Sequence, residues 1–226
     1  NISHVEHELE SAEFLVCNDI FMTETTRFAD VIFPAAAWGE YDGTFTSSER
    51  RVNRVRKIKD APGQSKPNWW IFREIAKRLG HDWKANSARE IWDNEHSLVA
   101  PAFAGIKYNR IENDGLQWPC PNEEHPGTKF LHKDGKFTRG KGLFKGIEWT
   151  PPAEVADAEY PLVLSTGRRL YHYHTRTQTG RCGLDRVIDD KTGLNQMMGE
   201  ETADISAVDA KKLGIKHGEY VKVSSR

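Results

Sequence analysis

An irregular stretch from Ala100 to Glu148 divides this 226-residue chain into two parts with different patterning. The stretch is rich in Gly, Pro, Asn and His, and the pair Pro151-Pro152 follows it, which is typical of surface loop and linker. Before it, apolar segments alternate between strand-like and helix-like spacing. After it, the segments are extended. The sequence therefore predicts the tail of an α/β domain, a linker, and the beginning of a β-barrel domain.

Strand and helix signals alternate in the part before the linker. Phe14–Cys17 and Ala29–Phe33 are short apolar runs that predict strands, and Pro34 closes the second run. From Trp69 to Leu79 the apolar residues recur at three- and four-residue spacing, which predicts an amphipathic helix. Asn68 stands at the N-cap position of this helix.

Further local signals lie between and after these elements. Gly80 stands where a helix commonly ends, and a second helix is expected from Ser87, with Glu90 completing a capping box. Gly39–Ser48 is rich in turn residues. Arg50–Lys59 has six cationic residues in ten, and because it lacks aromatic residues for base stacking we interpret it as a solvated or subunit-facing strand.

The part after the linker reads as β-rich. Pro161–Thr166 predicts a strand, and Arg169–Thr179 alternates and is rich in Tyr, His and Thr. A capped helix is expected from Ser206 to Leu213, and Tyr220–Val223 predicts a final strand. Because the chain lacks a starting Met and stops inside a predicted strand, we expect it to be a fragment.

Composition excludes several classes of protein. A net charge of −1 gives no global attraction to nucleic acid or to a membrane surface. The apolar runs are far shorter than the roughly 20 residues that span a bilayer. Cys17, Cys120 and Cys182 form no Cys-x-x-Cys pair, so neither a zinc site nor an iron–sulfur site can be read from this chain. Sparse cysteine favours a cytoplasmic location, with a periplasmic one left open.

A first candidate site follows the first predicted strand. Asn18-Asp19 and Thr23 lie just beyond its end, where ligands of open parallel sheets bind, and short polar side chains there can hydrogen-bond a nucleotide. The structural alternative is a simple Asx-turn or helix cap. Asn68 has the same two interpretations, since a helix N-terminus also offers free N–H groups.

A second candidate site begins where the strand Pro161–Thr166 ends. Gly167 allows a ligand to approach the backbone, and residues 168–186 contain five arginines and two histidines against the single acid Asp185. Forked guanidinium donors suit phosphate or carboxylate groups. In a strand, His172 and His174 would share one face. Three interpretations remain: a polyanion site, a solvated face, and a metal pair, for which two histidines are too few.

Taken together, these segments resemble the formate dehydrogenase branch of the molybdopterin oxidoreductases along nearly the whole chain. Three runs carry the likeness: "NWWIFREIAKRLG", "YPLVLSTGRRLYHYHTRTQTGR" and "DISAVDAKKLGIKHGEYVKVSSR". A fourth region matches the family's spaced motifs with Asp19 and Thr23, Ala29-Asp30-Val31 and Pro34, Glu40 and Gly43-Thr44, and Glu49 and Arg51.

The resemblance implies a fold, a reaction and a cofactor. Residues 1–135 would be the end of a Rossmann-like α/β molybdopterin-binding domain plus linker. Residues 136–226 would start a C-terminal double-psi, aspartate-decarboxylase-like β-barrel. The parent enzyme would interconvert formate and carbon dioxide, using molybdenum or tungsten held by bis-molybdopterin guanine dinucleotide, with a 4Fe–4S cluster in an upstream part. Implied partners are electron-transfer subunits or an electron carrier, with no nucleic acid and no membrane span.

The resemblance also implies roles for residues. No catalytic residue and no metal ligand falls in this chain, because in the family they lie upstream. Side chains at the first candidate site would hold one guanine dinucleotide, and those at the second would hold pterin and phosphate groups. The first group is Asn18, Asp19, Thr23, Ala35 and Asn68, with only backbone contacts from Ala35. The second group is Thr166, Gly167, Arg168, Arg169, His172, His174 and Thr175.

Two rival functions remain open at the level of sequence. A nitrate reductase or another member of the same superfamily would share most of these motifs. An iron–sulfur scaffold subunit of a respiratory NADH dehydrogenase would share the fold but lack the pterin cofactor. The polar residues Asp19, Arg168, His172 and His174 favour a cofactor-binding protein over the scaffold, because an empty site would not need them. By itself, this chain is expected to have no activity.

Overall fold

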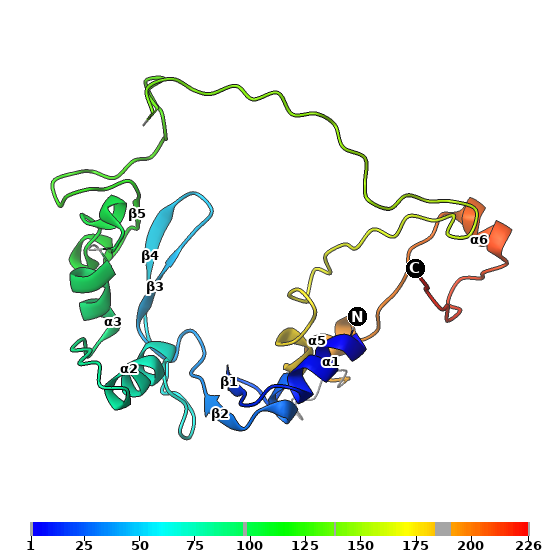
Figure 1. Cartoon of the computed structure of the whole chain (residues 1–226), viewed down its shortest axis with the longest axis horizontal. Helices are drawn as coiled ribbons and strands as arrows, with labels where there is room; N and C mark the ends of the chain where they lie inside the picture. Colours follow the sequence, from blue (N-terminus) through cyan, green and yellow to red (C-terminus); the bar gives the residue numbers. More distant parts are fainter. Residues whose placement is uncertain (1, 97–98, 138, 184–190, 226) are drawn as a thin grey trace. The chain divides into compact units, whose positions relative to one another are not determined.

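The computed structural model describes residues 2–96, 99–137, 139–183 and 191–225 (Figure 1). The chain divides into two compact units, Asn1–Phe144 and Lys145–Arg226. The domain boundary expected between residues 135 and 136 stays a prediction.

Short helices and two small sheets make up the first unit. Its helical elements are α1 (Ile2–Glu10), the 3₁₀ helix η1 (Thr25–Phe28), α2 (Asn68–Arg78), α3 (Ala88–Glu90), the π-helix η2 (Ile91–His96), and the 3₁₀ helices η3 (Pro101–Phe103) and η4 (Tyr108–Ile111). Its strands are β1 (Val16–Asp19), β2 (Val31–Pro34), β3 (Gly43–Thr46), β4 (Arg51–Val55) and β5 (Leu116–Gln117). The mixed α/β class is thus confirmed in its coarse form.

The first sheet pairs β1 and β2 in parallel, with Val16 opposite Val31 and Asp19 opposite Pro34. Parallel strands need a crossover, and here it contains η1. Both predicted strands are confirmed, each shifted toward the C-terminus. Because the two strands run in the same direction, their carboxyl ends lie at the same edge of the sheet.

The second sheet is antiparallel, with strand order β3-β4-β5. The basic block forms β4 as expected, and its Val52 is fully buried. The turn-rich interpretation of Gly39–Ser48 is incomplete, because β3 lies within it. Thr44 pairs with Arg54 and Phe45 with Asn53, so β3 is stabilised by backbone hydrogen bonds to β4. Its own turn-rich residues did not predict a strand.

Helix α2 begins at Asn68, so the prediction of Asn68 as its N-cap is wrong. Pro67 occupies the N-cap position and has no side-chain donor or acceptor to cap the helix. The end at Gly80 is confirmed: Gly80 has φ +87° and donates to Lys77 O at 3.1 Å, while the next N–H, of His81, donates to Ala76 O at 2.9 Å. This pair of hydrogen bonds closes the helix in a left-handed turn.

The second predicted helix has a modified capping box. Ser87 Oγ accepts from Glu90 N at 3.1 Å, as expected. The Glu90 carboxylate instead accepts from Asn86 N at 2.7 Å, one residue before the predicted donor. The helix continues from α3 into the π-helical turn η2.

The segment predicted to be a surface loop from Ala100 onward holds the core of the first unit, so this prediction is wrong for its first half. Ile106, Ile111 and Cys120 are buried together with Val52, and Trp92, Phe103, Leu116 and Trp118 pack against them. Side chains hold the irregular backbone: Arg110 donates to Gly105 O at 2.5 Å and to His125 O at 2.8 Å. These apolar side chains are therefore buried although the sequence around them has neither helical nor strand-like hydrophobic periodicity. Exposed apolar side chains such as Phe144 and Ile147 mark the linker-like second half.

The second unit contains η5 (Thr179–Arg181), α5 (Leu194–Met197) and α6 (Ala207–Leu213). Helix α6 is confirmed, since Ser206 Oγ accepts from Asp209 N at 3.1 Å and Gly214 ends the helix with φ +72°. In the described residues of this unit no strand forms, which corrects the prediction for Pro161–Thr166 and Tyr220–Val223. A strand needs a hydrogen-bonded neighbour, and Pro161–Thr166 makes no backbone hydrogen bond to a described residue.

Neither a membrane span nor a metal-ligand cluster occurs among the described residues. No helix there is long and apolar enough to cross a bilayer. No group of three His, Cys, Asp or Glu side chains is placed to hold a metal ion in that part of the chain.

The aromatic cluster beside the core makes the stability of the first unit depend on pH. His96 stacks on Trp92 with ring centroids 4.3 Å apart and meets Phe103 edge-on at 5.0 Å. Burial lowers the pKa of the His96 imidazole below its ordinary value. Since the unfolded chain then binds protons more readily, stability is expected to fall as the pH drops below about 6.5.

Denaturant unfolding of the full-length protein at about pH 7.5 and about pH 5.5 measures this loss. A His96→Phe variant keeps a stacking ring but does not titrate, so its loss over the same interval is expected to be smaller. Equal losses in the two proteins would show that His96 does not contribute.

Candidate functional site

The carboxyl ends of β1 and β2 and the start of α2 meet in the first unit. Asn18 Nδ2 donates to Asn68 Oδ1 at 3.1 Å. Ala35 N donates to Asp19 O at 3.0 Å, which continues the β1–β2 ladder. Lys66, just before the helix, pairs with Ala35 and donates to Pro34 O at 3.1 Å. Residues separated by up to 50 positions are thereby brought to one edge.

Four of the five predicted residues of the first group lie at this edge. Asn18 and Asn68 are exposed, while Ala35 is buried and its backbone takes part in the edge; a backbone contact from Ala35 to the cofactor stays a prediction. Asp19 Oδ1 accepts from Phe21 N at 3.1 Å, so the Asx-turn interpretation holds for this carboxylate. Thr23 is buried, and its carbonyl accepts from Thr26 Oγ1 at 2.7 Å. Thr23 therefore supports the start of η1.

Polar groups at this edge are arranged for a ligand with both donors and acceptors. Because Asn18 Nδ2 is engaged by Asn68 Oδ1, the Asn18 oxygen and the Asn68 NH₂ group remain available for other partners. The first backbone N–H groups of α2 have no capping side chain. A planar molecule with adjacent hydrogen-bonding atoms would match this combination.

In the second unit, His172 is buried and both of its ring nitrogens are hydrogen-bonded. Nε2 lies 2.6 Å from Met198 O, and Nδ1 lies 3.1 Å from Thr179 Oγ1. Since a carbonyl can only accept, Nε2 carries the proton and Nδ1 accepts from Thr179. Thr179 Oγ1 in turn accepts from Tyr173 N at 3.0 Å. The imidazole is thus fixed in one orientation.

The prediction that His172 and His174 share one face is wrong. No strand forms there among the described residues, and His174 lies in a turn with φ +51° and an exposed side chain. The remaining predicted residues of this group are on the surface or partly so. Arg169 donates to the Thr202 hydroxyl and is partly buried; the exposed ones are Thr166, Gly167, Arg168 and Thr175.

Sequence reasoning missed a buried polar cluster below this surface. Arg176 Nη2 donates to Asn195 Oδ1 at 3.1 Å, and Asn195 Nδ2 donates to Gly180 O at 2.6 Å. Arg176 also pairs with Glu201 at 3.3 Å, and Arg181 donates to Thr177 O. The concentration of arginines between residues 168 and 186 was the signal for two of these side chains, whereas nothing in the sequence marked Asn195.

The two groups of predicted residues lie in different units. The structure brings Asn18, Asp19, Ala35 and Asn68 together, and it places His172 beside the Arg176 cluster within the other unit. Contact of both groups with one ligand stays a prediction. Arg186 and Asp185, which contributed to the sequence argument, lie outside the described residues.

Two family models match this chain. Residues 1–78 match the model described as molybdopterin oxidoreductase, and residues 162–226 match the molydopterin dinucleotide binding domain. The first covers the β1–β2–α2 edge, and the second covers the segment that contains His172.

Similar curated proteins match over the whole chain. The F420-dependent formate dehydrogenase 2 subunit alpha of Methanococcus maripaludis is 49% identical over 100% of the chain and 32% of its own length. Formate dehydrogenase H of Escherichia coli is 37% identical, and the periplasmic nitrate reductase of Desulfovibrio desulfuricans is 34% identical, each over 100% of the chain. The chain covers 31% and 32% of those two proteins, and so spans about a third of the length of these relatives.

Among solved structures, acetylene hydratase from Pelobacter acetylenicus matches with a TM-score of 0.43 and 21% identity. The match covers 51% of this chain and 16% of that protein.

Proposed function

Because this chain belongs to the molybdopterin oxidoreductase family, we propose that it is a cofactor-holding part of the catalytic subunit of a formate dehydrogenase. Identity of 49% to a formate dehydrogenase alpha subunit over the whole chain supports this proposal. The structural observation that carries it is the Asn18–Asn68 hydrogen bond, which joins two predicted cofactor residues. The complete enzyme would oxidise formate reversibly to carbon dioxide, with release of two electrons and one proton.

The groups at the β1–β2–α2 edge fit a guanine base. Guanine presents the acceptor O6 beside the donor N1–H and the exocyclic amino group. The Asn68 NH₂ group can donate to O6, and the Asn18 oxygen can accept from a ring or amino N–H. These two amides hold each other in register, so the pair would orient the base of one dinucleotide.

Residues of the second unit fit phosphate and pterin groups. Exposed Arg168 offers a forked donor, and among the described residues, its chain neighbours aside, no atom lies within 4 Å of the place where a Gly167 side chain would be. His172, held by Thr179 and Met198, would act by positioning the loop that carries these residues. When bound, the molybdenum or tungsten pterin supplies the two-electron chemistry, and the chain contributes binding and orientation.

The finer fold assignment belongs to the same proposal. Leu162, Val163 and Leu164 are 50%, 80% and 73% exposed. We infer that they are strand residues of a double-psi barrel whose partner strands lie outside this chain, with residues 136–226 as its beginning. An open apolar strand of this kind is a liability unless it is paired.

Electrons would leave through an upstream 4Fe–4S cluster to partner subunits or a soluble carrier. Two relatives are named as F420-dependent formate dehydrogenase subunits, which supports F420 as the electron carrier in this proposal. We also propose a cytoplasmic location, which fractionation of the source cells tests directly.

Formate-dependent reduction of a viologen dye tests the reaction. The full-length protein is expected to reduce the dye with formate, whereas the isolated 226-residue chain is expected to be inactive because the metal ligand and the cluster lie elsewhere. Dye reduction by the isolated chain would contradict the assignment of the metal ligand and the cluster to other parts of the protein.

The same assay separates the rival functions. A nitrate reductase would oxidise reduced viologen with nitrate and would not respond to formate. The similarity to a periplasmic nitrate reductase makes this control necessary. A scaffold subunit would respond to neither substrate and would contain no molybdenum, tungsten or pterin.

A further inference from the structure

The first unit contains a pocket whose wall includes no predicted cofactor residue. It measures 550 Å³ and lies between the β3–β4 hairpin, the loop before α2, and the starts of α2 and α3. This volume falls within the roughly 300–1,000 Å³ of typical small-molecule sites. Its wall includes Asp42, Arg54, Lys66, Arg89 and Tyr108.

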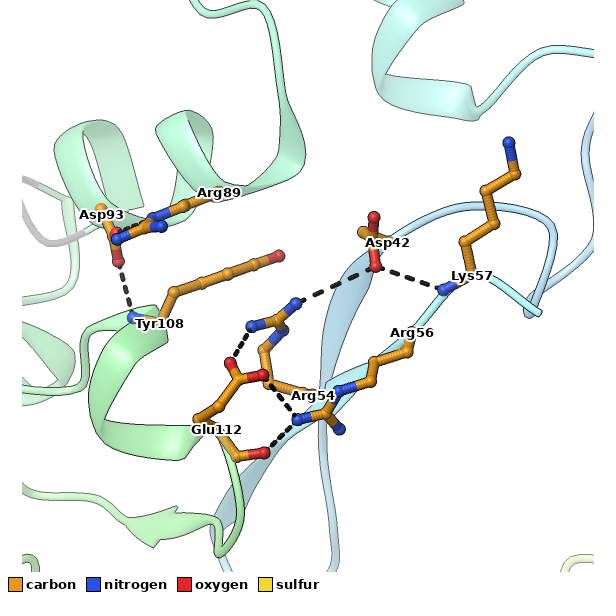
Figure 2. Close-up of polar contacts among 8 residues, drawn as sticks. All are labelled: Asp42, Arg54, Arg56, Lys57, Arg89, Asp93, Tyr108 and Glu112. Atoms are coloured by element: carbon orange, nitrogen blue, oxygen red, sulfur yellow. Dashed lines mark hydrogen bonds and ion pairs between the residues drawn. The ribbon is translucent and has the colours of Figure 1, made fainter. Parts of the chain in front are cut away.

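Tyr108 carries a buried hydroxyl without a partner. The residue is 3% exposed, and its hydroxyl makes no hydrogen bond to any described residue. Its backbone N–H donates to Asp93 at 2.9 Å, and Figure 2 shows the hydroxyl at the end of the ring remote from Asp93. A hydroxyl that has lost its water partners without replacement is costly, so an added acceptor here would be favourable.

Arg54 provides a second donor of the same kind. Its guanidinium lies over the Tyr108 ring at 4.1 Å, and Nη1 donates to Glu112 at 2.7 Å (Figure 2). Its Nε, however, is buried and finds no acceptor among the described residues. Both residues line the pocket, and a ligand that presents oxygen atoms would supply acceptors for these two donors.

The charges around the pocket favour an anion. The three carboxylates of the wall are already engaged by neighbouring groups. Glu40 accepts from Ala37 N and pairs with Lys59, Asp42 accepts from Lys57 N, and Asp60 pairs with the Lys57 ammonium. Lys66 lies over the Trp70 ring and forms no ion pair with a described carboxylate. A positive charge is therefore left without a counter-ion at the rim.

We propose that this pocket binds a small molecule through an oxyanion group, a phosphate or a carboxylate, which accepts hydrogen bonds from the Tyr108 hydroxyl and from Arg54 Nε. Lys66 supplies the compensating charge at the rim. Burial raises the pKa of the Tyr108 hydroxyl above its ordinary value, so the group remains a donor at neutral pH. The pocket wall includes none of the predicted cofactor residues, although Lys66, Pro67 and Trp69 of the wall flank Asn68 in the chain.

Titration calorimetry of the full-length protein tests the proposal in two arms, with inorganic phosphate and with succinate. Saturable binding is expected in one arm, and that arm identifies the oxyanion. Tyr108→Phe removes only the hydroxyl, so it is expected to weaken binding on the order of tenfold. Lys66→Gln is expected to weaken binding more at low than at high ionic strength.

Two controls keep the result interpretable. Tyr220→Phe removes a hydroxyl from a residue that is 93% exposed and outside the pocket, and its affinity is expected to be unchanged. Without ligand, Tyr108→Phe is expected to melt no lower than the parent protein, because the lost hydroxyl had no partner. Absence of binding in both arms, unchanged affinity in Tyr108→Phe, or a lower melting temperature of unliganded Tyr108→Phe would each overturn the proposal.

Discussion

Replacing Ile106 by alanine is expected to lower the free energy of unfolding of the first unit by about 2–5 kcal/mol. Ile106 is 1% exposed and packs in the core with Val52, Ile111 and Cys120, so truncation leaves a cavity. Native-state hydrogen exchange of the full-length protein measures the effect locally. Suitable probes are the amides of Gly105 and Cys120, which donate to Cys120 O and Ala102 O.

Ile147→Ala is the matched control for this change. Ile147 is 92% exposed, so the same truncation is expected to change stability by less than about 0.5 kcal/mol. If the two variants lost equal stability, the segment that contains Ile106 would not be a core. The comparison therefore separates a buried irregular segment from a surface loop.

Changing Asn68 to leucine in the full-length protein is expected to lower its pterin and metal content on the order of tenfold, because one or two hydrogen bonds to the cofactor are lost. The change also removes the acceptor for Asn18 Nδ2, so the Asn18 amide loses the contact that orients it. Asn68→Asp keeps an acceptor for Asn18 Nδ2 but has no donor for the guanine O6, so its cofactor content is expected to fall less than that of Asn68→Leu. Metal analysis and pterin fluorescence after oxidation measure both variants.

Asn109→Leu controls for the loss of an asparagine amide in the same unit. Asn109 is exposed in η4 and does not belong to either proposed site, so its variant is expected to keep full cofactor content. Normal cofactor content in Asn68→Leu would exclude a binding role for the Asn18–Asn68 pair.

Elements with strong local signals were predictable from the sequence. The apolar runs before Asn18 and Pro34 form paired strands, and the glycine after Leu79 ends α2. Ser206 caps α6 as its spacing indicated. In these cases the determining interactions lie within a few residues, or the pattern itself records which face is buried.

The core around Ile106 and Cys120 was not predictable in this way. Its backbone follows no regular element, and long-range side-chain donors satisfy its carbonyls: Arg110 reaches His125 O, and Arg50 reaches Thr128 O at 2.9 Å. Long-range hydrogen bonds of this kind produce no regular pattern of apolar residues in the sequence. A basic block that looked like a solvated face instead contributes an arginine that holds this core in place.

The candidate site residues also differ in how far local sequence signals predict their structure. The places of Asn18 at a strand end and of Asn68 at the start of α2 were predictable from local signals, but the hydrogen bond between them depends on the tertiary fold. Their contact with a cofactor stays a prediction. For His172 and His174 the predicted strand geometry was wrong, since a strand depends on partners and His174 adopts a turn conformation instead. Tyr108 carried no signal, because only the fold shows that its hydroxyl is buried without a partner.

Direct quantification of metal and pterin in the purified full-length protein tests whether this chain helps to enclose a pterin dinucleotide. We expect two guanine-bearing pterins and one molybdenum or tungsten atom per polypeptide. A correctly folded, active protein with neither pterin nor metal would contradict this expectation.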